Sequence, residues 1–131
     1  LIMTLGGTIH EAVDAADKLT INNIITDVYN LRFIKPIDIE YLINILKNYS
    51  IVIMVEDGII NGGIGQEISA LLQNFKIDKI YRILGITDEF PPHATREELL
   101  EMYKMNSSGI IRTVDEIVNT PGNLRIVKST G

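Results

Sequence analysis

The chain has 131 residues, 46% of them hydrophobic and 22% charged, with a formal net charge of −5 and an isoelectric point near 4.9. This length and balance are typical of one soluble globular domain, and the acidic surface argues against nucleic acid or an anionic membrane as a partner. The absence of cysteine excludes a disulfide framework and thiolate chemistry. No apolar run reaches the length of a membrane span, and no signal peptide is recognisable.

Short apolar runs alternate with amphipathic helical patterns along the chain. Runs rich in β-branched residues predict strands at residues 1–5, 24–29, 51–55 and 79–84. Helices are predicted to start at Thr8, Asp38, Ile64, Thr95 and Asn106. Thr8 and Thr95 are each followed three residues later by a glutamate, which predicts two capping boxes, and Asp38 caps its helix alone. The stripes predicted to face the core are Ile9, Ala12, Val13, Ala16 and Leu19; Ile39, Leu42, Ile43 and Leu46; Ile64, Ile68, Leu71, Leu72 and Phe75; and Ile110, Val114, Ile117 and Val118.

Strands that alternate with helices through short turns predict a parallel sheet with helices on both faces. The run 79–84 alternates in part between polar and apolar residues, which indicates a strand nearer an edge of the sheet. Residues 124–127 have the pattern of a further short strand that could pair antiparallel at an edge. We treat residues 1–131 as a single domain, and we expect it to be a piece of a longer protein because Leu1 lies inside a predicted strand.

The most distinctive stretch is the buried strand 51–55 with the glycine-rich turn and helix that follow it. Glycines at 62, 63 and 65 allow close backbone approaches, and a phosphate at a helix N-terminus is one use of such a turn. Gln66 and Glu67 stand where a Walker motif needs lysine and serine or threonine. Glu56, Asp57 and Glu67 would repel an anion and would complement the helix dipole themselves. The turn therefore predicts close packing of strand and helix.

The sequence predicts no catalytic, cofactor-binding or metal site. The two histidines, His10 and His93, fit a solvated helix turn and a proline-braced loop. No cysteine–histidine cluster and no G-x-S-x-G motif is present. Glu56 and Asp57 are neighbours on an extended segment, so their side chains should point apart and make a poor acid–base pair.

Three segments resemble thiamine-diphosphate enzymes of the transketolase type. Residues 28–38 are similar to the N-A-R-F-x-K-P-L-D segment of the C-terminal domain of such enzymes, and residues 55–65 to its V-E-E/D-G…G-G-x-G segment. Residues 84–100, with Gly109 and Ile110 beyond, resemble the G-x-P-D-x-F-x-x-H-G…G-I pattern of 1-deoxy-D-xylulose-5-phosphate synthases. The resemblance covers residues 1–119 and leaves residues 120–131 as a tail.

The resemblance implies three α/β/α layers around a mostly parallel five-stranded sheet with one antiparallel edge strand, which the tail strand at 124–127 is expected to supply. It implies a structural and assembly domain of a cytoplasmic, homodimeric synthase that joins pyruvate to glyceraldehyde 3-phosphate for isoprenoid precursors. In that family thiamine diphosphate and Mg²⁺ bind to the other domains, which are the implied partners. This chain contains no G-D-G cofactor signature, so no cofactor is expected in it.

Two other interpretations stay open. The same domain type occurs in transketolases, β subunits of 2-oxoacid dehydrogenases and ferredoxin oxidoreductases, where it can act as a docking module. A stand-alone anion- or nucleotide-binding module would instead use the glycine-rich turn. We expect Arg32 and Lys35, in a loop beyond a strand end, to make an inter-domain contact. Further residues assigned to such a contact or to structural loops are Glu56, Gly58, Gly62, Gly63, Gly65 and His93.

Overall fold

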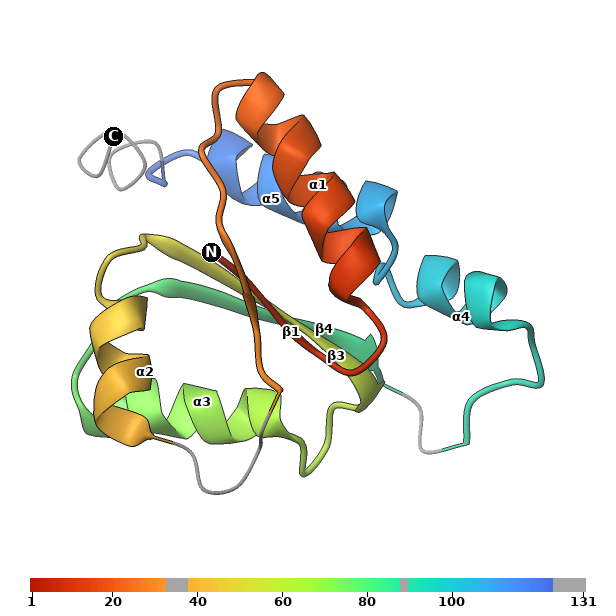
Figure 1. Ribbon diagram of the computed structural model, residues 1–131, viewed down its shortest axis with the longest axis horizontal. Coiled ribbons are helices and arrows are strands. Elements are labelled where there is room, and N and C mark those ends of the chain that lie inside the picture. The colour runs from red at the N-terminus through yellow and green to blue at the C-terminus, as the bar shows by residue number, and fades with distance from the viewer. Residues whose placement is uncertain (33–37, 88–89, 124–131) are drawn as a thin grey trace.

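A computed structural model describes residues 1–32, 38–87 and 90–123 (Figure 1). Within these residues the sheet has four parallel strands in the order β2-β1-β3-β4. Its strands are β1 (Ile2–Leu5), β2 (Val28–Asn30), β3 (Ile51–Ile59) and β4 (Ile80–Ile86). The predicted parallel sheet and the edge position of β4 are confirmed, while the tail strand predicted at 124–127 lies outside the described residues.

Helices cover both faces of the sheet, which confirms the three-layer architecture (Figure 1). One face carries α1 (Ile9–Ile21) and α5 (Ser107–Asn119), and the other carries α2 (Ile39–Leu46) and α3 (Ile64–Asn74). The short helix α4 (Arg96–Met102) lies beyond the carboxyl ends of the strands (Figure 1).

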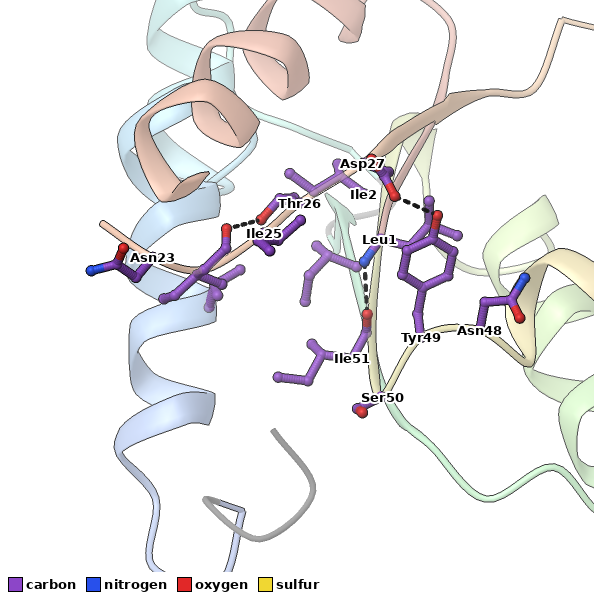
Figure 2. Close-up of a pocket in the computed structure, with 13 residues that line it drawn as sticks. Leu1, Ile2, Asn23, Ile25, Thr26, Asp27, Asn48, Tyr49, Ser50 and Ile51 are labelled. Carbon is purple, nitrogen blue, oxygen red and sulfur yellow. Dashed lines mark hydrogen bonds between the residues drawn. The ribbon is translucent and has the colours of Figure 1, made fainter. Parts of the chain in front are cut away.

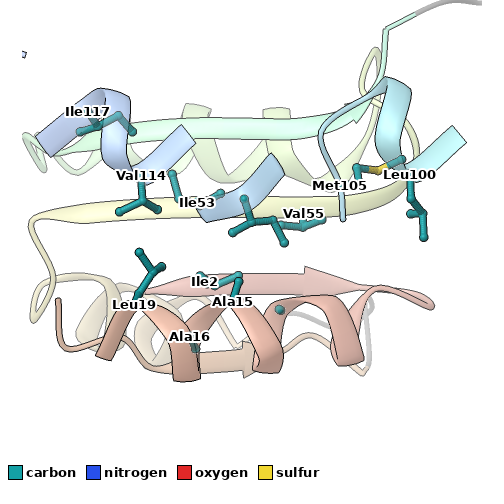
Figure 3. Packing of buried hydrophobic residues seen from close by; sticks show 12 residues of the cluster. Ile2, Ala15, Ala16, Leu19, Ile53, Val55, Leu100, Met105, Val114 and Ile117 are labelled. Atoms are coloured by element: carbon teal, nitrogen blue, oxygen red, sulfur yellow. The ribbon is translucent and has the colours of Figure 1, made fainter. Parts of the chain in front are cut away.

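Strand β3 shows why the central run is continuously apolar. Ile53 and Val55 pack under α1 and α5 (Figure 3), whereas Val52 and Met54 pack under α2 and α3. Successive strand residues point to opposite faces, and both faces are covered here, so residues 52–55 are all buried and Ile51, at the start of the strand, is partly buried. Each such side chain stabilises the fold by about 1.5–3 kcal/mol relative to exposure.

Two strand boundaries differ from the prediction. Strand β3 continues past its predicted end at Val55 to Ile59, with an irregular register between these two residues. Strand β2 is limited to Val28–Asn30, because residues of its predicted first half make local bonds instead of ladder bonds. The Thr26 amide donates to the Thr20 hydroxyl, and the Thr26 hydroxyl donates to a neighbouring carbonyl.

Helix caps follow local sequence wherever no tertiary partner competes. Asp38 accepts from the Tyr41 amide, and Thr95 accepts from the Glu98 amide, as predicted. Asn106 caps α5 in the same way.

The capping box predicted at Thr8 is wrong. The Thr8 hydroxyl donates to the carbonyl of Val55, at 3.3 Å, so it does not cap the helix that follows it. The carboxylate of Glu11 accepts from the amide of Ser107, at 2.6 Å. Both side chains have a tertiary partner, and the local motif is therefore not formed.

Three residues of the predicted core stripes are about half exposed. Val13, Ile39 and Phe75 have exposed fractions of 43%, 44% and 54%. The buried face of α1 runs through alanines, at Ala12, Ala15 and Ala16, which turns Val13 outward. Ile39 is the first residue of α2 and Phe75 follows the last residue of α3, so both lie at helix ends where the covering layer stops.

Candidate functional site

The carboxyl edge of the sheet gathers most of the residues that the sequence marked for a contact or structural loop. Parallel strands all end at this edge, and in open α/β sheets the loops there commonly carry function. Gly58, Gly62, Gly63 and Gly65 lie together on or after the end of β3. Arg32 and His93 are exposed on the segments that follow β2 and β4, and Lys35 lies outside the described residues.

Glu56 caps helix α3 from the neighbouring strand. Its side chain is only 6% exposed, and its two carboxylate oxygens accept from the amides of Ile64, at 2.8 Å, and Gly65, at 3.3 Å. A carboxylate at this position satisfies amides that have no partner inside the helix and complements the positive end of the dipole. The residue at the N-cap position, Gly63, has no side chain to do this.

The glycines after β3 make room for that carboxylate. A Cβ on Gly63 would lie 2.2 Å from Oε1 of Glu56. A Cβ on Gly65 would lie 2.9 Å from Cγ2 of Ile83 in β4. The turn is thus built for close packing of α3 on the sheet, and a carboxylate of the protein occupies the place that an anion would take.

Tyr81 completes the polar contacts around the first turn of α3. Its hydroxyl donates to the carbonyl of Gly65, at 2.7 Å. Burial raises the pKa of this hydroxyl well above its ordinary value, and the negative charge of Glu56 raises it further. Tyr81 therefore stays neutral and acts as a fixed hydrogen-bond donor.

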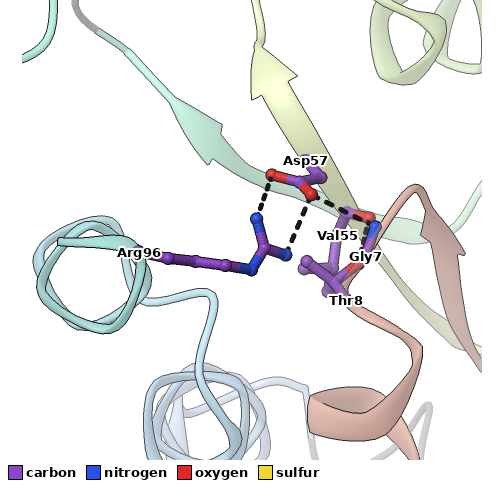
Figure 4. A network of polar contacts seen from close by, with 5 residues as sticks. All are labelled: Gly7, Thr8, Val55, Asp57 and Arg96. Atoms are coloured by element: carbon purple, nitrogen blue, oxygen red, sulfur yellow. Dashed lines mark hydrogen bonds and ion pairs between the residues drawn. The ribbon is translucent and has the colours of Figure 1, made fainter.

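Asp57 points to the opposite face of β3 from Glu56, as the alternation of strand residues predicts. One of its oxygens accepts from the amide of Gly7, at 3.1 Å, and from Nη2 of Arg96, at 2.9 Å (Figure 4). Nη1 of the same guanidinium donates to the second oxygen, at 3.4 Å. These hydrogen bonds connect the turn after β1, the end of β3 and the start of α4.

The turn at Gly6 and Gly7 has to be free of side chains for this network to form. Gly6 has a positive φ of 87°, and a Cβ on Gly7 would lie 2.5 Å from Nη2 of Arg96. Sequence reasoning missed Arg96 as a partner of Asp57. A basic residue in the first turn of a helix interacts unfavourably with the helix dipole. Its presence at position 96 could therefore have indicated an acidic partner elsewhere in the fold.

These polar groups are engaged in structural contacts, and their arrangement does not suit proton transfer or a diphosphate cofactor. Glu56 and Asp57 lie on opposite faces of a strand and bind different partners, Ile64 and Arg96. Among the described residues, no group of three aspartate, glutamate, histidine or cysteine side chains could hold a metal ion. The N-terminus of α3 does not fit the diphosphate of thiamine diphosphate, since the carboxylate of Glu56 already accepts from its amides.

A cavity of about 330 Å³ opens at the other end of the strands, the amino edge of the sheet (Figure 2). Aliphatic side chains form most of its wall, among them Leu1, Ile24 and Ile51. The hydroxyl of Tyr49 donates to the carboxylate of Asp27, at 2.6 Å, on the polar side of the cavity (Figure 2). This cavity could not be predicted from the sequence, because its wall combines strand starts, loops and a residue of α5 that are distant along the chain.

The Asp27–Tyr49 bond predicts how the fold responds to alkali. The bond to Asp27, burial and the charge of Asp27 raise the pKa of Tyr49 from its ordinary value of 10.0 to about 12. The stability linked to this hydroxyl is fully present below pH 10 and is lost as the pH rises through 12. We expect Asp27→Asn to lower the pKa of Tyr49, measured by phenolate absorbance, with Tyr49→Phe identifying its signal. An unchanged titration in Asp27→Asn would contradict the assignment.

Known proteins are similar to this chain in sequence. Residues 1–110 match the family model described as transketolase, C-terminal domain. The chain is 34% identical over 113 residues to a 1-deoxy-D-xylulose-5-phosphate synthase of Nitrosococcus oceani, which covers 86% of this chain and 17% of that protein. It is 32% identical over 127 residues to the synthase of Listeria monocytogenes, which covers 95% of this chain and 21% of that protein.

A solved structure shares the fold. It is described as a split gene transketolase in an inactive beta4 tetramer, and it matches with a TM-score of 0.75 at 27% sequence identity. The match covers 88% of this chain and 37% of that one. No helix within the described residues is long and apolar enough to cross a membrane.

The family match covers the whole described sheet. The matched residues 1–110 run from β1 into the first turn of α5 and include the whole described sheet. The chain spans about a fifth of the length of the curated relatives it matches. On these grounds the chain belongs to the transketolase C-terminal domain family.

Proposed function

We propose that this chain is the C-terminal structural and assembly domain of a thiamine-diphosphate-dependent enzyme of the transketolase type, a 1-deoxy-D-xylulose-5-phosphate synthase. The observation that carries the proposal is the 32–35% identity to such synthases over 86–95% of the chain. The other four-fifths of such an enzyme would hold thiamine diphosphate and Mg²⁺ and would join pyruvate to glyceraldehyde 3-phosphate. The same proposal includes a homodimeric parent in the cytoplasm.

The geometry at the carboxyl edge supports an assembly role. The side chains of Glu56 and Asp57 make contacts inside the domain, which supports a structural role for both. Arg32 and His93 are exposed at this edge and form, with Lys35, the proposed contact with the other domains. On this proposal the isolated chain does not turn over pyruvate.

The rival function, a stand-alone anion-binding module, is disfavoured by one contact. Such a module would need the amides of Ile64 and Gly65, and both donate to the carboxylate of Glu56. A phosphate would have to displace a buried carboxylate that is already paired with these donors.

A domain exchange tests the proposal. The C-terminal domain of the synthase of Caldanaerobacter subterraneus, to which this chain is 35% identical, is replaced by this chain. We expect the chimera to form 1-deoxyxylulose 5-phosphate from pyruvate and glyceraldehyde 3-phosphate, and the synthase truncated before this domain to assemble poorly. The isolated chain should consume no pyruvate. A chimera no more active than the truncated enzyme, or pyruvate turnover by the chain alone, would overturn the proposal.

A further inference from the structure

Residues 90–92, which precede α4, form a run of exposed apolar residues. Phe90 is 87% exposed, the highest value among the large hydrophobic side chains of the described residues. Pro91 and Pro92, which follow it, are exposed as well. Single exposed apolar residues are common on protein surfaces, whereas a consecutive aromatic and apolar run is typical of contact surfaces.

Residues 90–95 are anchored at their C-terminal end, where α4 begins. The two prolines each have a fixed φ. Thr95 then caps α4, because its hydroxyl oxygen accepts from the amide of Glu98, at 3.2 Å, and its hydroxyl donates to the carboxylate of the same residue. The next residue, Arg96, is bound to Asp57 at the end of β3. A segment that is already ordered loses little conformational entropy when it binds a partner.

Residues 90–95 lie away from the two helix layers of this domain. Residues 90–95 lie beyond the carboxyl ends of the strands, clear of both helix layers (Figure 1). The core of the domain is completed by the two helix layers, so the fold itself does not require an exposed phenylalanine here. The neighbouring surface of α4 carries exposed acidic side chains, at Glu97, Glu98 and Glu101.

We infer that Phe90, Pro91 and Pro92 form a plug that enters an apolar socket, bordered by lysine or arginine, on the domains that precede this one in a transketolase-type enzyme. This inference rests on the proposed function and names the contact by which the domain attaches. The occupant of the surface follows from two observations. The curated relatives continue for about four-fifths of their length outside the matched region, which makes the rest of the same enzyme the available partner. The exposed acidic side chains of α4 beside the plug favour a basic rim on that partner.

The chimera described above provides the test, with hydrogen exchange as the readout. The amides of Phe90, His93, Ala94 and Thr95 should exchange at least about tenfold more slowly in the chimera than in the isolated chain, because docking shields them. Phe90→Asp should abolish this protection and lower the temperature at which the chimera loses activity. Phe75→Asp is the matched control, since Phe75 is also exposed, at 54%, but lies at the C-terminal end of α3.

The outcomes separate this inference from the proposed function. An active chimera in which residues 90–95 exchange as fast as in the isolated chain would overturn the plug and leave the proposed function standing. The plug would also be overturned, with the proposed function standing, if the chimera were active and Phe90→Asp and Phe75→Asp had equal effects on exchange and on thermal inactivation. An inactive, unassembled wild-type chimera would overturn both. Protection that is lost only in Phe90→Asp would support the plug.

Discussion

Replacing Glu56 with alanine is expected to lower the free energy of unfolding by about 3 kcal/mol, the sum of a lost charged hydrogen bond and an uncapped helix. The amides of Ile64 and Gly65, both buried in the first turn of α3, would lose their acceptor. Tyr81 would remain bonded to the Gly65 carbonyl but would lose the neighbouring charge. Urea denaturation followed by circular dichroism measures the change.

Glu67 provides the matched control for Glu56. It is a glutamate in the first turn of the same helix, but it is exposed and lies on the outer surface. Glu67→Ala should therefore cost only about 0.3–1 kcal/mol, through the helix dipole alone. If Glu56→Ala were no more destabilising than Glu67→Ala, the structural role assigned to the buried carboxylate would be wrong.

Gly63→Ala is expected to destabilise the domain by about 2 kcal/mol, although alanine can adopt the backbone angles of this residue. Its φ of −86° and ψ of 177° are ordinary extended values, so backbone strain is not the reason. The added Cβ would lie 2.2 Å from Oε1 of Glu56, which forces the carboxylate off the helix. Thermal and urea unfolding of the variant measure the loss.

The control for this change is another glycine of the same segment. A Cβ on Gly58 meets nothing within 4 Å, and Gly58→Ala should change stability by less than about 0.5 kcal/mol. The double variant Glu56→Ala with Gly63→Ala gives a second check, because both changes act through one contact. It should be about as stable as Glu56→Ala alone, and strictly additive losses would show that the two residues act separately.

Much of the architecture was predictable because it depends on local patterns. The alternation of strands and helices, the parallel sheet and the edge position of β4 follow from hydrophobic periodicity. The caps at Asp38, Thr95 and Asn106 were predictable for the same reason, since a cap is made within a few residues. Prediction failed at Thr8, where residues distant in sequence compete for the same polar groups.

In the candidate site, too, local features were predictable and contacts between distant residues were not. The divergence of Glu56 and Asp57 could be foreseen from strand geometry, and a carboxylate role at the helix dipole could be foreseen from the crowding of acids near Gly63. The pairing of Asp57 with Arg96 could not, because thirty-nine residues separate them and only the folded chain brings α4 to the end of β3. The cavity beside Tyr49 could not be predicted for a similar reason, since its wall combines segments that are distant in sequence.

By itself the sequence determined the layers of this domain, its parallel sheet and its family resemblance, since these rest on periodic apolar residues and on short continuous motifs. Only the tertiary structure decided which acid caps α3, which glycines must lack a side chain, and which arginine braces the carboxyl edge. The difference lies in how far apart along the chain the interacting residues are. Periodicity and capping act over a few residues, whereas a buried carboxylate takes whichever donors the packed chain places within hydrogen-bond distance.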